Sequence, residues 1–281
     1  VILTEINSNL HHPQIVANID TLISTFSEDD FKNFTPDLLI TFGGMIVSKR
    51  VKAMFRTYKP KHHWHVDELR AYDTFSSLTS HLKTTPNNFI QHFKEVYELN
   101  NSNFAFDIHK IMLQRKKGHD LYIDQIPFSD LKTFSIIWKH LPNNIQLQIS
   151  NSAVIRYAQL FETHPTIDVF CNRGTSGIDG STSTSIGAAV VVEKPTVILT
   201  GDISFLYDSN ALWNNYIPKN YKIIIINNGG GGIFRILPGH SENQTFNTFF
   251  ETEHKLTAEH LAKMYHFNYL KADNEADLNM A

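Results

Sequence analysis

Short apolar runs alternate with longer segments in which apolar residues recur at helical spacing along most of the chain. The short runs predict buried strands, and the longer segments predict helices that cover them. The expected strands span 36–44, 62–67, 145–150, 167–172, 196–202, 221–228 and 267–272. The expected helices span 45–58, 86–99, 104–119, 128–141, 152–162, 209–216 and 257–266. Strands that alternate with helices form parallel sheets, so the predicted fold class is α/β with doubly wound parallel sheets.

Length and polarity divide the chain into two predicted domains. The chain has 281 residues, and a domain typically holds ~100–200. The polar stretch over 100–103 is the best candidate for a linker, so we predict one domain over 1–101 and a second over 102–281. The sequence opens in a strand-like run without an initiator methionine. We therefore expect a fragment of a longer protein, with a first domain that is incomplete at its N-terminus.

Charge and cysteine content exclude several classes of function. The 25 Lys and Arg residues nearly balance 28 Asp and Glu residues, so the net charge of −3 offers no field that attracts nucleic acid or an anionic membrane. The longest strongly apolar run, 223–226, is far shorter than a membrane span. Cys171 is the one cysteine, which rules out an intramolecular disulfide and favours a reducing compartment. The sequence predicts a cytoplasmic protein that binds no nucleic acid and no membrane.

Two polar motifs end two successive predicted strands. Asp202 ends the strand over 196–202, and Asn228 ends the strand over 221–228, directly before four glycines. Ligands of open parallel sheets bind outside the carboxyl ends of the strands. A carboxylate, a carboxamide oxygen and a carbonyl in a glycine turn are hard oxygen ligands, which suit Mg²⁺ together with phosphate and water. The two motifs together predict a clamp for a metal diphosphate. Taken alone, Asp202 could simply cap the following helix, and the Asn-Gly run could be an ordinary turn.

Longer motifs around these residues carry a resemblance to a known family. The GD and NN pair is similar to the thiamine diphosphate signature, in which the Asp, the second Asn and a carbonyl two residues later hold Mg²⁺. Ile203 stands where that signature usually has a glycine. The segments FGGMIVSKR, NSAVIR, NRGTSGIDG, GDISFLYDSNAL and GGIFRILP resemble the 2-succinyl-5-enolpyruvyl-6-hydroxy-3-cyclohexene-1-carboxylate synthase family of menaquinone biosynthesis. The resemblance spans nearly the whole chain.

This resemblance implies a thiamine-diphosphate-binding fold with an incomplete central domain and a diphosphate-binding domain that is short at its C-terminus. It implies a transferase that decarboxylates 2-oxoglutarate and adds the resulting carbanion to isochorismate. The cofactors would be thiamine diphosphate and Mg²⁺ or Mn²⁺. The family forms homo-oligomers that share the cofactor site between subunits, and a glutamate on an N-terminal domain activates the cofactor. Because that domain would precede Val1, we expect the fragment alone to be inactive.

The resemblance also implies roles for single residues. Arginine forks suit planar carboxylates, so Arg156 and Arg173 are candidate substrate clamps, and Lys49 would add positive charge. Without the neighbouring motifs, the simplest interpretation of each of these three residues is a solvated charge on the surface. The apolar wall beside the reactive carbon would be Ile233, Phe234 and Leu237. The cofactor-binding candidates are Asn151, Ser152, Ile178, Gly201, Asp202, Ile203, Ser204, Asn228 and Gly230, of which Asp202, Asn228 and Gly230 would hold the metal.

Several alternatives stay open at this point. Asn151 and Ser152 could simply cap a helix, and Ile178 could be a core residue. The parent protein could be another thiamine diphosphate carboligase that acts on a different 2-oxoacid. It could also be a non-catalytic α/β binding module that keeps the fold and the metal clamp. The histidines at 62, 63 and 65 alternate in a strand and lack a partner cluster, so they do not indicate a metal site.

Overall fold

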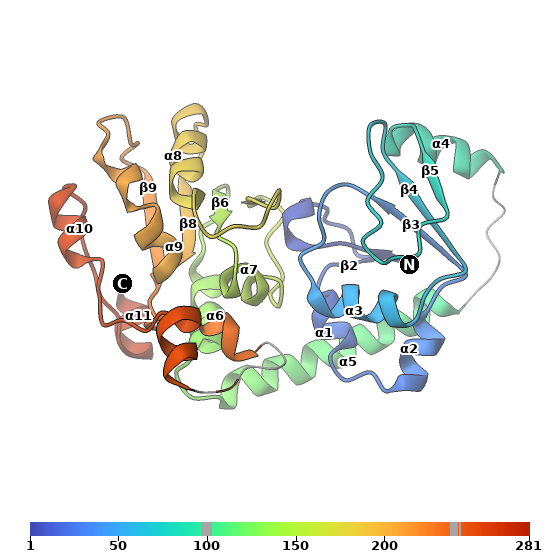
Figure 1. The fold of residues 1–281 in the computed structure, drawn as a ribbon, viewed down its shortest axis with the longest axis horizontal. Coiled ribbons are helices and arrows are strands. Elements are labelled where there is room, and N and C mark those ends of the chain that lie inside the picture. The colour runs from blue at the N-terminus through green and yellow to red at the C-terminus, as the bar shows by residue number, and fades with distance from the viewer. Residues whose placement is uncertain (97–102, 237–240, 242) are drawn as a thin grey trace. The chain divides into compact units, whose positions relative to one another are not determined.

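The computed structural model describes residues 1–96, 103–236, 241 and 243–281 (Figure 1). These residues form two units, one of residues 1–5 and 12–119 and one of residues 6–11 and 120–281. The predicted domain boundary at residue 101 and Leu237 both lie outside the described residues. The division into domains over 1–101 and 102–281 therefore stays a prediction. Every helix among the described residues is too short or too polar to cross a membrane.

Parallel strands form the centre of the first unit. One sheet has the order β3-β4-β5, and a second sheet pairs β1 with β2. The strands are β1 (Ile2–Leu3), β2 (Ile15–Val16), β3 (Leu38–Phe42), β4 (His62–Val66) and β5 (Ser80–Leu82). The helices are α1 (Ile19–Ile23), α2 (Glu28–Phe34), α3 (Lys49–Thr57) and α4 (Pro86–Val96). Helix α5 (Phe104–Gln125) begins in this unit and ends in the second.

Local sequence explains where these helices lie. Helix α2 begins with a capping box, in which Ser27 and Asp30 each accept a hydrogen bond from the backbone N–H of the other. Its last residue, Phe34, is buried in an apolar cluster with Met54 and Phe55 of α3. Burial of one helix face against such a cluster is the main source of helix stability in proteins.

A buried polar cluster lies within the sheet of the first unit. His63 and His65 on β4 are 0% and 3% exposed. Thr41 of β3 contacts both, with its Oγ1 atom 2.9 Å from His63 Nε2 and 2.9 Å from His65 Nδ1. Burial lowers the pKa of both histidines, because the charged ring loses its hydration. The alternating histidines are thus neutral core residues that share one hydroxyl.

The second unit contains a four-stranded parallel sheet in the order β7-β6-β8-β9. The strands are β6 (Gln146–Ile149), β7 (Asp168–Cys171), β8 (Thr196–Gly201) and β9 (Tyr221–Ile226). The helices are α6 (Asp130–His140), α7 (Ala153–Ala158), α8 (Ser181–Val191), α9 (Asp202–Tyr207), α10 (Glu259–Met264) and α11 (Glu275–Met280). Shorter 3₁₀ helices are η1 (Ile6–Ser8), η2 (Ser209–Trp213) and η3 (Gly232–Ile236), and η4 (Phe246–Glu251) is a π-helix. The predicted α/β class with parallel sheets is confirmed.

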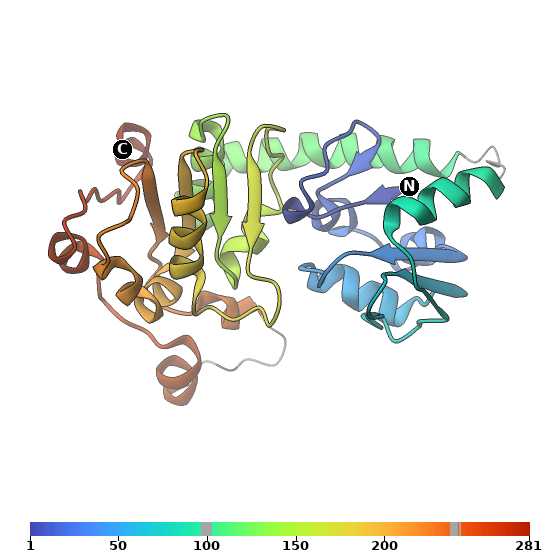
Figure 2. The ribbon, with the colours of Figure 1, turned by 90° about the horizontal axis from the view of Figure 1, so that it is seen from above.

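Both faces of this sheet are covered. Val197, Ile198 and Leu199 are consecutive on β8, point alternately to opposite faces, and are all at most 5% exposed. Ile198 packs with Ile186 and Ala189 of α8 in one apolar cluster. The view from above shows α8 running beside the strands (Figure 2). The continuous apolar run in the sequence thus correctly predicts a strand that is buried on both faces.

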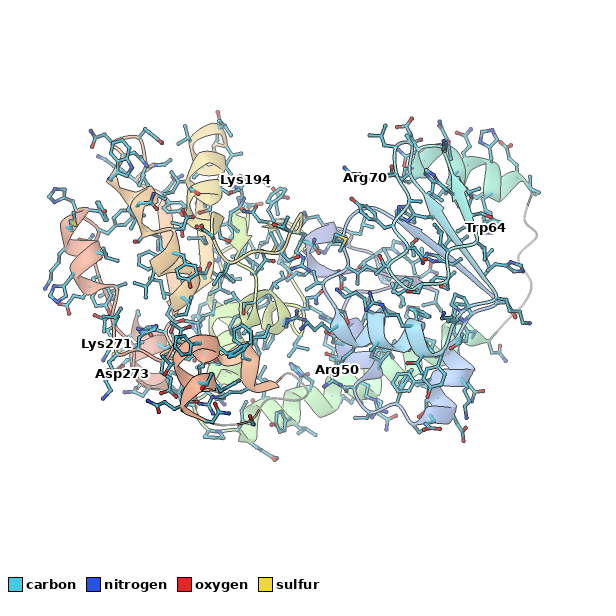
Figure 3. The ribbon with its side chains drawn as sticks, in the orientation of Figure 1. Arg50, Trp64, Arg70, Lys194, Lys271 and Asp273 are labelled. Atoms are coloured by element: carbon cyan, nitrogen blue, oxygen red, sulfur yellow. The ribbon has the colours of Figure 1, made fainter. Side chains whose placement is uncertain are left out.

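The strand predicted over 267–272 is wrong, because this segment forms neither helix nor strand. The backbone N–H of Phe267 donates to Ala262 at the end of α10 (2.8 Å) and makes no ladder with β9. The Phe267 side chain packs on the apolar cluster around Ile198. Lys271 forms an exposed ion pair with Asp273 at 2.7 Å (Figure 3), which contributes little to stability.

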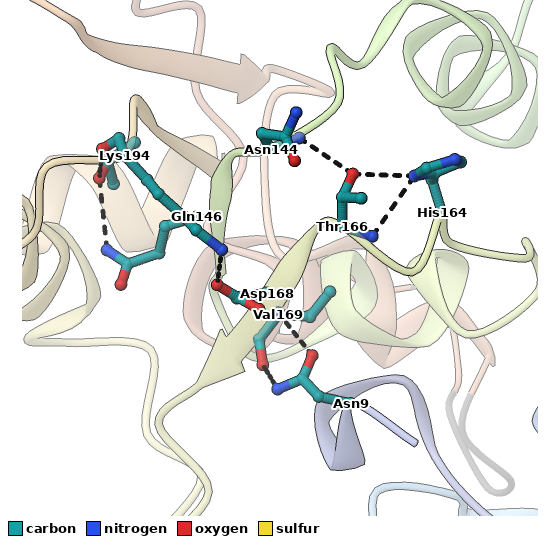
Figure 4. Close-up of polar contacts among 9 residues, drawn as sticks. Asn9, Asn144, Gln146, His164, Thr166, Asp168, Val169 and Lys194 are labelled. Carbon is teal, nitrogen blue, oxygen red and sulfur yellow. Dashed lines mark hydrogen bonds and ion pairs between the residues drawn. The ribbon is translucent and has the colours of Figure 1, made fainter. Parts of the chain in front are cut away.

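An asparagine from the start of the chain completes the open edge of β7 (Figure 4). Asn9 donates from Nδ2 to the Val169 carbonyl at 2.9 Å and accepts from the Val169 N–H at 2.7 Å. The amide thus replaces the two hydrogen bonds that a neighbouring strand would make. Asp168, one residue earlier on β7, pairs with Lys194 at 2.5 Å in the same view.

Candidate functional site

The strand order of the second unit predicts where a ligand binds. The chain runs from β6 to its neighbour β7 and then returns to the other side of β6 to form β8. In open parallel sheets, the carboxyl ends of the strands at such a reversal form the ligand site. The residues that follow β6 and β8 are Ser150–Ser152 and Asp202–Ser204, and they include five of the predicted cofactor-binding residues.

The carboxylate of Asp202 connects the two motifs that end β8 and β9. Its Oδ2 atom accepts hydrogen bonds from the backbone N–H groups of Gly229 (2.8 Å) and Gly230 (3.1 Å). Its Oδ1 atom accepts from the N–H of Ile203 at 2.7 Å. Asp202 is 4% exposed, and His254 Nε2 lies 3.3 Å from Oδ2. The predicted adjacency of β8 and β9 is confirmed, and the two motifs meet at one carboxylate.

The glycine run allows another backbone segment to approach closely. Gly230 has φ +159°, and a Cβ atom there would lie 2.9 Å from the Glu251 carbonyl oxygen. Gly231 donates its N–H to the same oxygen at 2.5 Å, and His254 donates its N–H to Gly229 at 3.0 Å. Glu251 is held in turn by the guanidinium of Arg235 at 2.6 and 2.5 Å. Glycine is required here because there is no room for a side chain.

Asn228 and Gly230 are the other two predicted metal ligands, through an amide oxygen and a backbone carbonyl oxygen. Asn228 is exposed and donates from Nδ2 to Asp130 Oδ2 at 2.8 Å. Its amide oxygen accepts no hydrogen bond from the described residues. The Gly230 carbonyl accepts from the N–H of Gly232 at 3.0 Å, which uses one of its two lone pairs. A carboxylate, an amide oxygen and a carbonyl match the chemistry that Mg²⁺ prefers.

A cation at this site cannot be held by charged side chains alone. Among the described residues, no three His, Cys, Asp or Glu side chains gather into a metal site. A cation held here would therefore need amide, carbonyl and phosphate oxygens, as a metal diphosphate provides.

Comparison with known proteins bears directly on this edge of the sheet. Residues 151–281 match the family described as thiamine pyrophosphate enzyme, C-terminal TPP binding domain. This segment belongs to that family. Thiamine pyrophosphate is another name for thiamine diphosphate, so the predicted thiamine-diphosphate-binding fold is confirmed. The matched residues include β7, β8, β9 and the motifs that end β8 and β9.

Three relatives match nearly the whole chain, and each is named 2-succinyl-5-enolpyruvyl-6-hydroxy-3-cyclohexene-1-carboxylate synthase. The protein of Flavobacterium psychrophilum is 60% identical over 281 residues, which are 99% of this chain and 50% of that protein. That of Flavobacterium johnsoniae is 62% identical over 279 residues, with 99% and 50% covered. That of Christiangramia forsetii is 48% identical over 283 residues, with 99% and 49% covered. The predicted resemblance is confirmed, and the chain spans about half the length of these relatives.

Asn151 organises the loop between β7 and α8 of this thiamine diphosphate-binding domain. Its Nδ2 atom donates to the carbonyls of Asn172 and Gly177, both at 2.7 Å. Its Oδ1 atom accepts from Arg173 Nη1 at 2.6 Å and from Cys171 Sγ at 3.4 Å. Burial raises the pKa of the Cys171 thiol to about 11, so it stays protonated and donates as observed. The Asn151 side chain fixes the Arg173 guanidinium and the loop backbone.

Ser152 follows β6, next to Asn151, and Ile178 lies within the loop between β7 and α8. Ser152 precedes α7 with φ +71° and makes no side-chain cap hydrogen bond, so neither Asn151 nor Ser152 caps the helix with its side chain. Ile178 is half-buried, and its carbonyl accepts a hydrogen bond from Ser204 Oγ of α9. The structure therefore brings the loop that carries Ile178 against the start of α9.

The other predicted site residues have separate places. Arg156 is half-buried on α7, Gly201 ends β8 and Ile203 lies in α9. Ile233 and Phe234 are half-buried in η3, next to the glycine turn. Lys49 is exposed at the start of α3 in the first unit. The roles of all these residues stay predictions.

Sequence patterns missed three residues that contact the site. Asp130 holds Asn228, His254 faces Asp202, and Glu251 abuts the glycine turn. Asp130 is recognisable in the sequence only as part of a helix start after Ser129. His254 and Glu251 lie in a stretch without periodicity, so no signal indicated them.

Proposed function

We propose that this chain is the C-terminal half of a 2-succinyl-5-enolpyruvyl-6-hydroxy-3-cyclohexene-1-carboxylate synthase. The complete enzyme decarboxylates 2-oxoglutarate and joins the remaining four-carbon unit to isochorismate. Thiamine diphosphate, when bound, supplies the carbanion chemistry of both steps, and the protein supplies binding and orientation. The homo-oligomeric assembly and the cytoplasmic location stay predictions of the sequence.

One structural observation supports the proposal most strongly. The Asp202 carboxylate, at the end of β8, binds the backbone of the glycine turn that follows β9. This contact joins the two halves of the thiamine diphosphate signature at the carboxyl ends of β8 and β9, and β8 is the strand next to the reversal at β6. Asp202, Asn228 and Gly230 would hold Mg²⁺ or Mn²⁺ there through oxygen atoms.

The substrate site must supply positive charge, because both proposed substrates carry carboxylates. Arg173 is oriented by its 2.6 Å hydrogen bond to the Asn151 amide, and its Nε atom is buried without a hydrogen-bond partner among the described residues. A guanidinium held in this way can present its remaining N–H groups to a carboxylate. Arg156 on α7 and Lys49 are the other proposed anion-binding residues.

The test uses the complete protein with thiamine diphosphate and Mg²⁺. We expect product formation from 2-oxoglutarate and isochorismate, and a fall in kcat/KM of roughly 10²-fold for Arg156→Ala and for Arg173→Ala. Arg70→Ala is the matched control, because Arg70 lies in the first unit (labelled in Figure 3), where its guanidinium lies over the Tyr72 ring. This substitution should leave kcat/KM unchanged.

Other outcomes would favour the alternatives. Turnover with a different 2-oxoacid in a substrate screen would indicate another thiamine diphosphate carboligase. Calorimetric binding of thiamine diphosphate and Mg²⁺ without turnover of any 2-oxoacid would indicate a non-catalytic binding module. Failure to bind the cofactor at all would refute the proposal.

A further inference from the structure

We propose that Asp130 and His254 are positioning residues, which orient the side chains of Asn228 and Asp202 toward a bound cation. This inference rests on the proposed function, because it assumes that Asp202 and Asn228 hold the metal of thiamine diphosphate. Ligand side chains in metal sites are commonly oriented by a second hydrogen-bonding partner. Each of these two side chains has such a partner, and the partners come from different elements.

Asp130 determines which end of the Asn228 amide is available. A carboxylate can only accept hydrogen bonds, so the amide nitrogen is the end that faces Asp130 Oδ2 at 2.8 Å. The amide oxygen, which is the end a cation needs, is left without a hydrogen bond to the described residues. Asp130 itself is fixed, since it is the first residue of α6 and follows the capping residue Ser129.

His254 is oriented toward Asp202 by its own backbone neighbours. The N–H of Leu256 donates to His254 Nδ1 at 3.1 Å, so the hydrogen of the neutral ring lies on Nε2. Nε2 lies 3.3 Å from Asp202 Oδ2 and has no aligned hydrogen bond to any described residue. The backbone N–H of His254 donates to Gly229, which anchors the ring beside the glycine turn.

The distribution of donors over the carboxylate of Asp202 supports this interpretation. Oδ2 faces three N–H groups, those of Gly229, Gly230 and the His254 ring. Within the described part of the chain, Oδ1 accepts from the N–H of Ile203 alone. Because each carboxylate oxygen has two lone pairs, Oδ1 keeps the capacity to bind a cation. The two backbone donors on Oδ2 hold the carboxylate in that orientation, and the His254 ring contacts the same oxygen.

The test for His254 compares two amide replacements in the complete protein. Gln can place an N–H near the position of Nε2, whereas Asn can replace only the acceptor at Nδ1. We measure the Mg²⁺ affinity at saturating thiamine diphosphate by calorimetry and the melting temperature of the apoprotein. His254→Asn should weaken Mg²⁺ binding about 10-fold or more, and His254→Gln should stay close to wild type. If Asn keeps wild-type affinity, or if both variants lose it equally, His254 does not act through Nε2.

The test for Asp130 separates its hydrogen bond from its charge at a helix start. Asp130→Ala removes both, whereas Asp130→Asn keeps an acceptor oxygen and loses the charge. Ala should weaken Mg²⁺ binding about 10-fold, and Asn should restore most of the affinity. Asp29→Ala is the matched control, because Asp29 also lies in the first turn of a helix and its carboxylate pairs with Lys32 in the first unit. Equal losses for Ala and Asn would show that the charge matters and would refute the orienting role.

Asp202→Ala separates failure of this inference from failure of the proposed function. If the wild-type protein shows no Mg²⁺-dependent binding of thiamine diphosphate, both fail together. If wild type binds, Asp202→Ala does not, and the Asp130 and His254 variants all bind Mg²⁺ normally, the proposed function stands and the positioning roles are refuted.

Discussion

Buried polar groups occupy different places in the three-stranded sheet of the first unit and the four-stranded sheet of the second. In the first unit, Thr41, His63 and His65 contact one another across β3 and β4, within the sheet. In the second unit, Asn151 and Asp202 lie beyond the ends of β6 and β8 and contact loops that follow other strands. The order of the first sheet follows the chain, whereas the order of the second reverses at β6. The comparison teaches that buried polar side chains indicate a ligand site when they lie at the carboxyl ends of strands where the strand order reverses.

The two clusters also differ in how they satisfy their hydrogen bonds. The histidines of β4 are neutral and share one hydroxyl of the neighbouring strand, while the second ring nitrogen of each is buried without a hydrogen-bond partner among the described residues. Asp202 instead collects backbone N–H groups from a turn that has no room for a Cβ atom. We interpret the first as a structural core and the second as a ligand-binding edge, and the following substitutions test this interpretation.

Asp202→Ala is expected to have the largest effect. It leaves the N–H groups of Gly229, Gly230 and Ile203 without their acceptor, so the free energy of unfolding should fall by roughly 3–5 kcal/mol. Cofactor binding should also be lost. Denaturant unfolding and calorimetry with thiamine diphosphate and Mg²⁺ measure the two effects.

Thr41→Val is the counterpart in the first unit. It removes the hydroxyl that His63 and His65 share, which should cost about 1–3 kcal/mol of stability. Cofactor affinity should not change. A loss of cofactor binding in Thr41→Val would contradict the distinction between structural and ligand-binding clusters.

Gly230→Ala is expected to lower stability more than Thr41→Val and less than Asp202→Ala. The added Cβ would lie 2.9 Å from the Glu251 carbonyl oxygen, and φ +159° is unfavourable for any L-residue. Stability should fall by roughly 2–4 kcal/mol in denaturant unfolding. Gly118→Ala is the matched control, because it lies inside α5 with open space around it and should gain about 0.5–1 kcal/mol. Equal stability of Gly230→Ala and wild type would show that the Glu251 segment moves away easily.

Sequence patterns predicted the strands β3, β4 and β6 to β9, because buried runs such as Val197–Leu199 are recognisable without tertiary information. They missed β2 and β5, which have two and three residues and are too short to show a pattern. They also placed Asp202 and Asn228 at neighbouring strand ends. They failed over 267–272, where an apolar pattern packs as an irregular segment instead of pairing with β9. His254 was unpredictable because its role depends on a contact with Asp202, which is distant from it along the chain.

A smaller effect is expected from pH, and it should be confined to the first unit. Burial lowers the pKa of His63 and His65 below the ordinary value of about 6.5, so the unfolded chain binds protons first as pH falls. Stability should therefore be constant above about pH 7 and decline as pH drops through 6.5 toward the folded values. Hydrogen exchange of β3 and β4 amides at pH 7.5 and at pH 5.5 measures this locally.

A double replacement provides the control for the pH effect. His63→Gln with His65→Gln removes both titrating rings, and Gln can still hydrogen-bond to the Thr41 hydroxyl. Exchange protection of β3 and β4 in this variant should be nearly independent of pH over the same interval. A decline as steep as that of wild type would show that the pH effect does not come from His63 and His65.

Ser152→Gly is expected to have the smallest effect, and its sign is opposite to that of the others. Ser152 has φ +71°, a region that costs an L-residue about 1–3 kcal/mol and costs glycine little. Glycine adds about 0.5–1 kcal/mol of backbone entropy loss on folding, so the net expectation is a gain of about 1 kcal/mol in denaturant unfolding. Ser24→Gly, at φ −58°, relieves no strain and should lose about 0.5–1 kcal/mol. If Ser152→Gly is less stable than wild type, the serine side chain contributes more than its backbone conformation costs. The strained turn after β6 would then be kept for that side chain, as expected for a residue that contacts the cofactor.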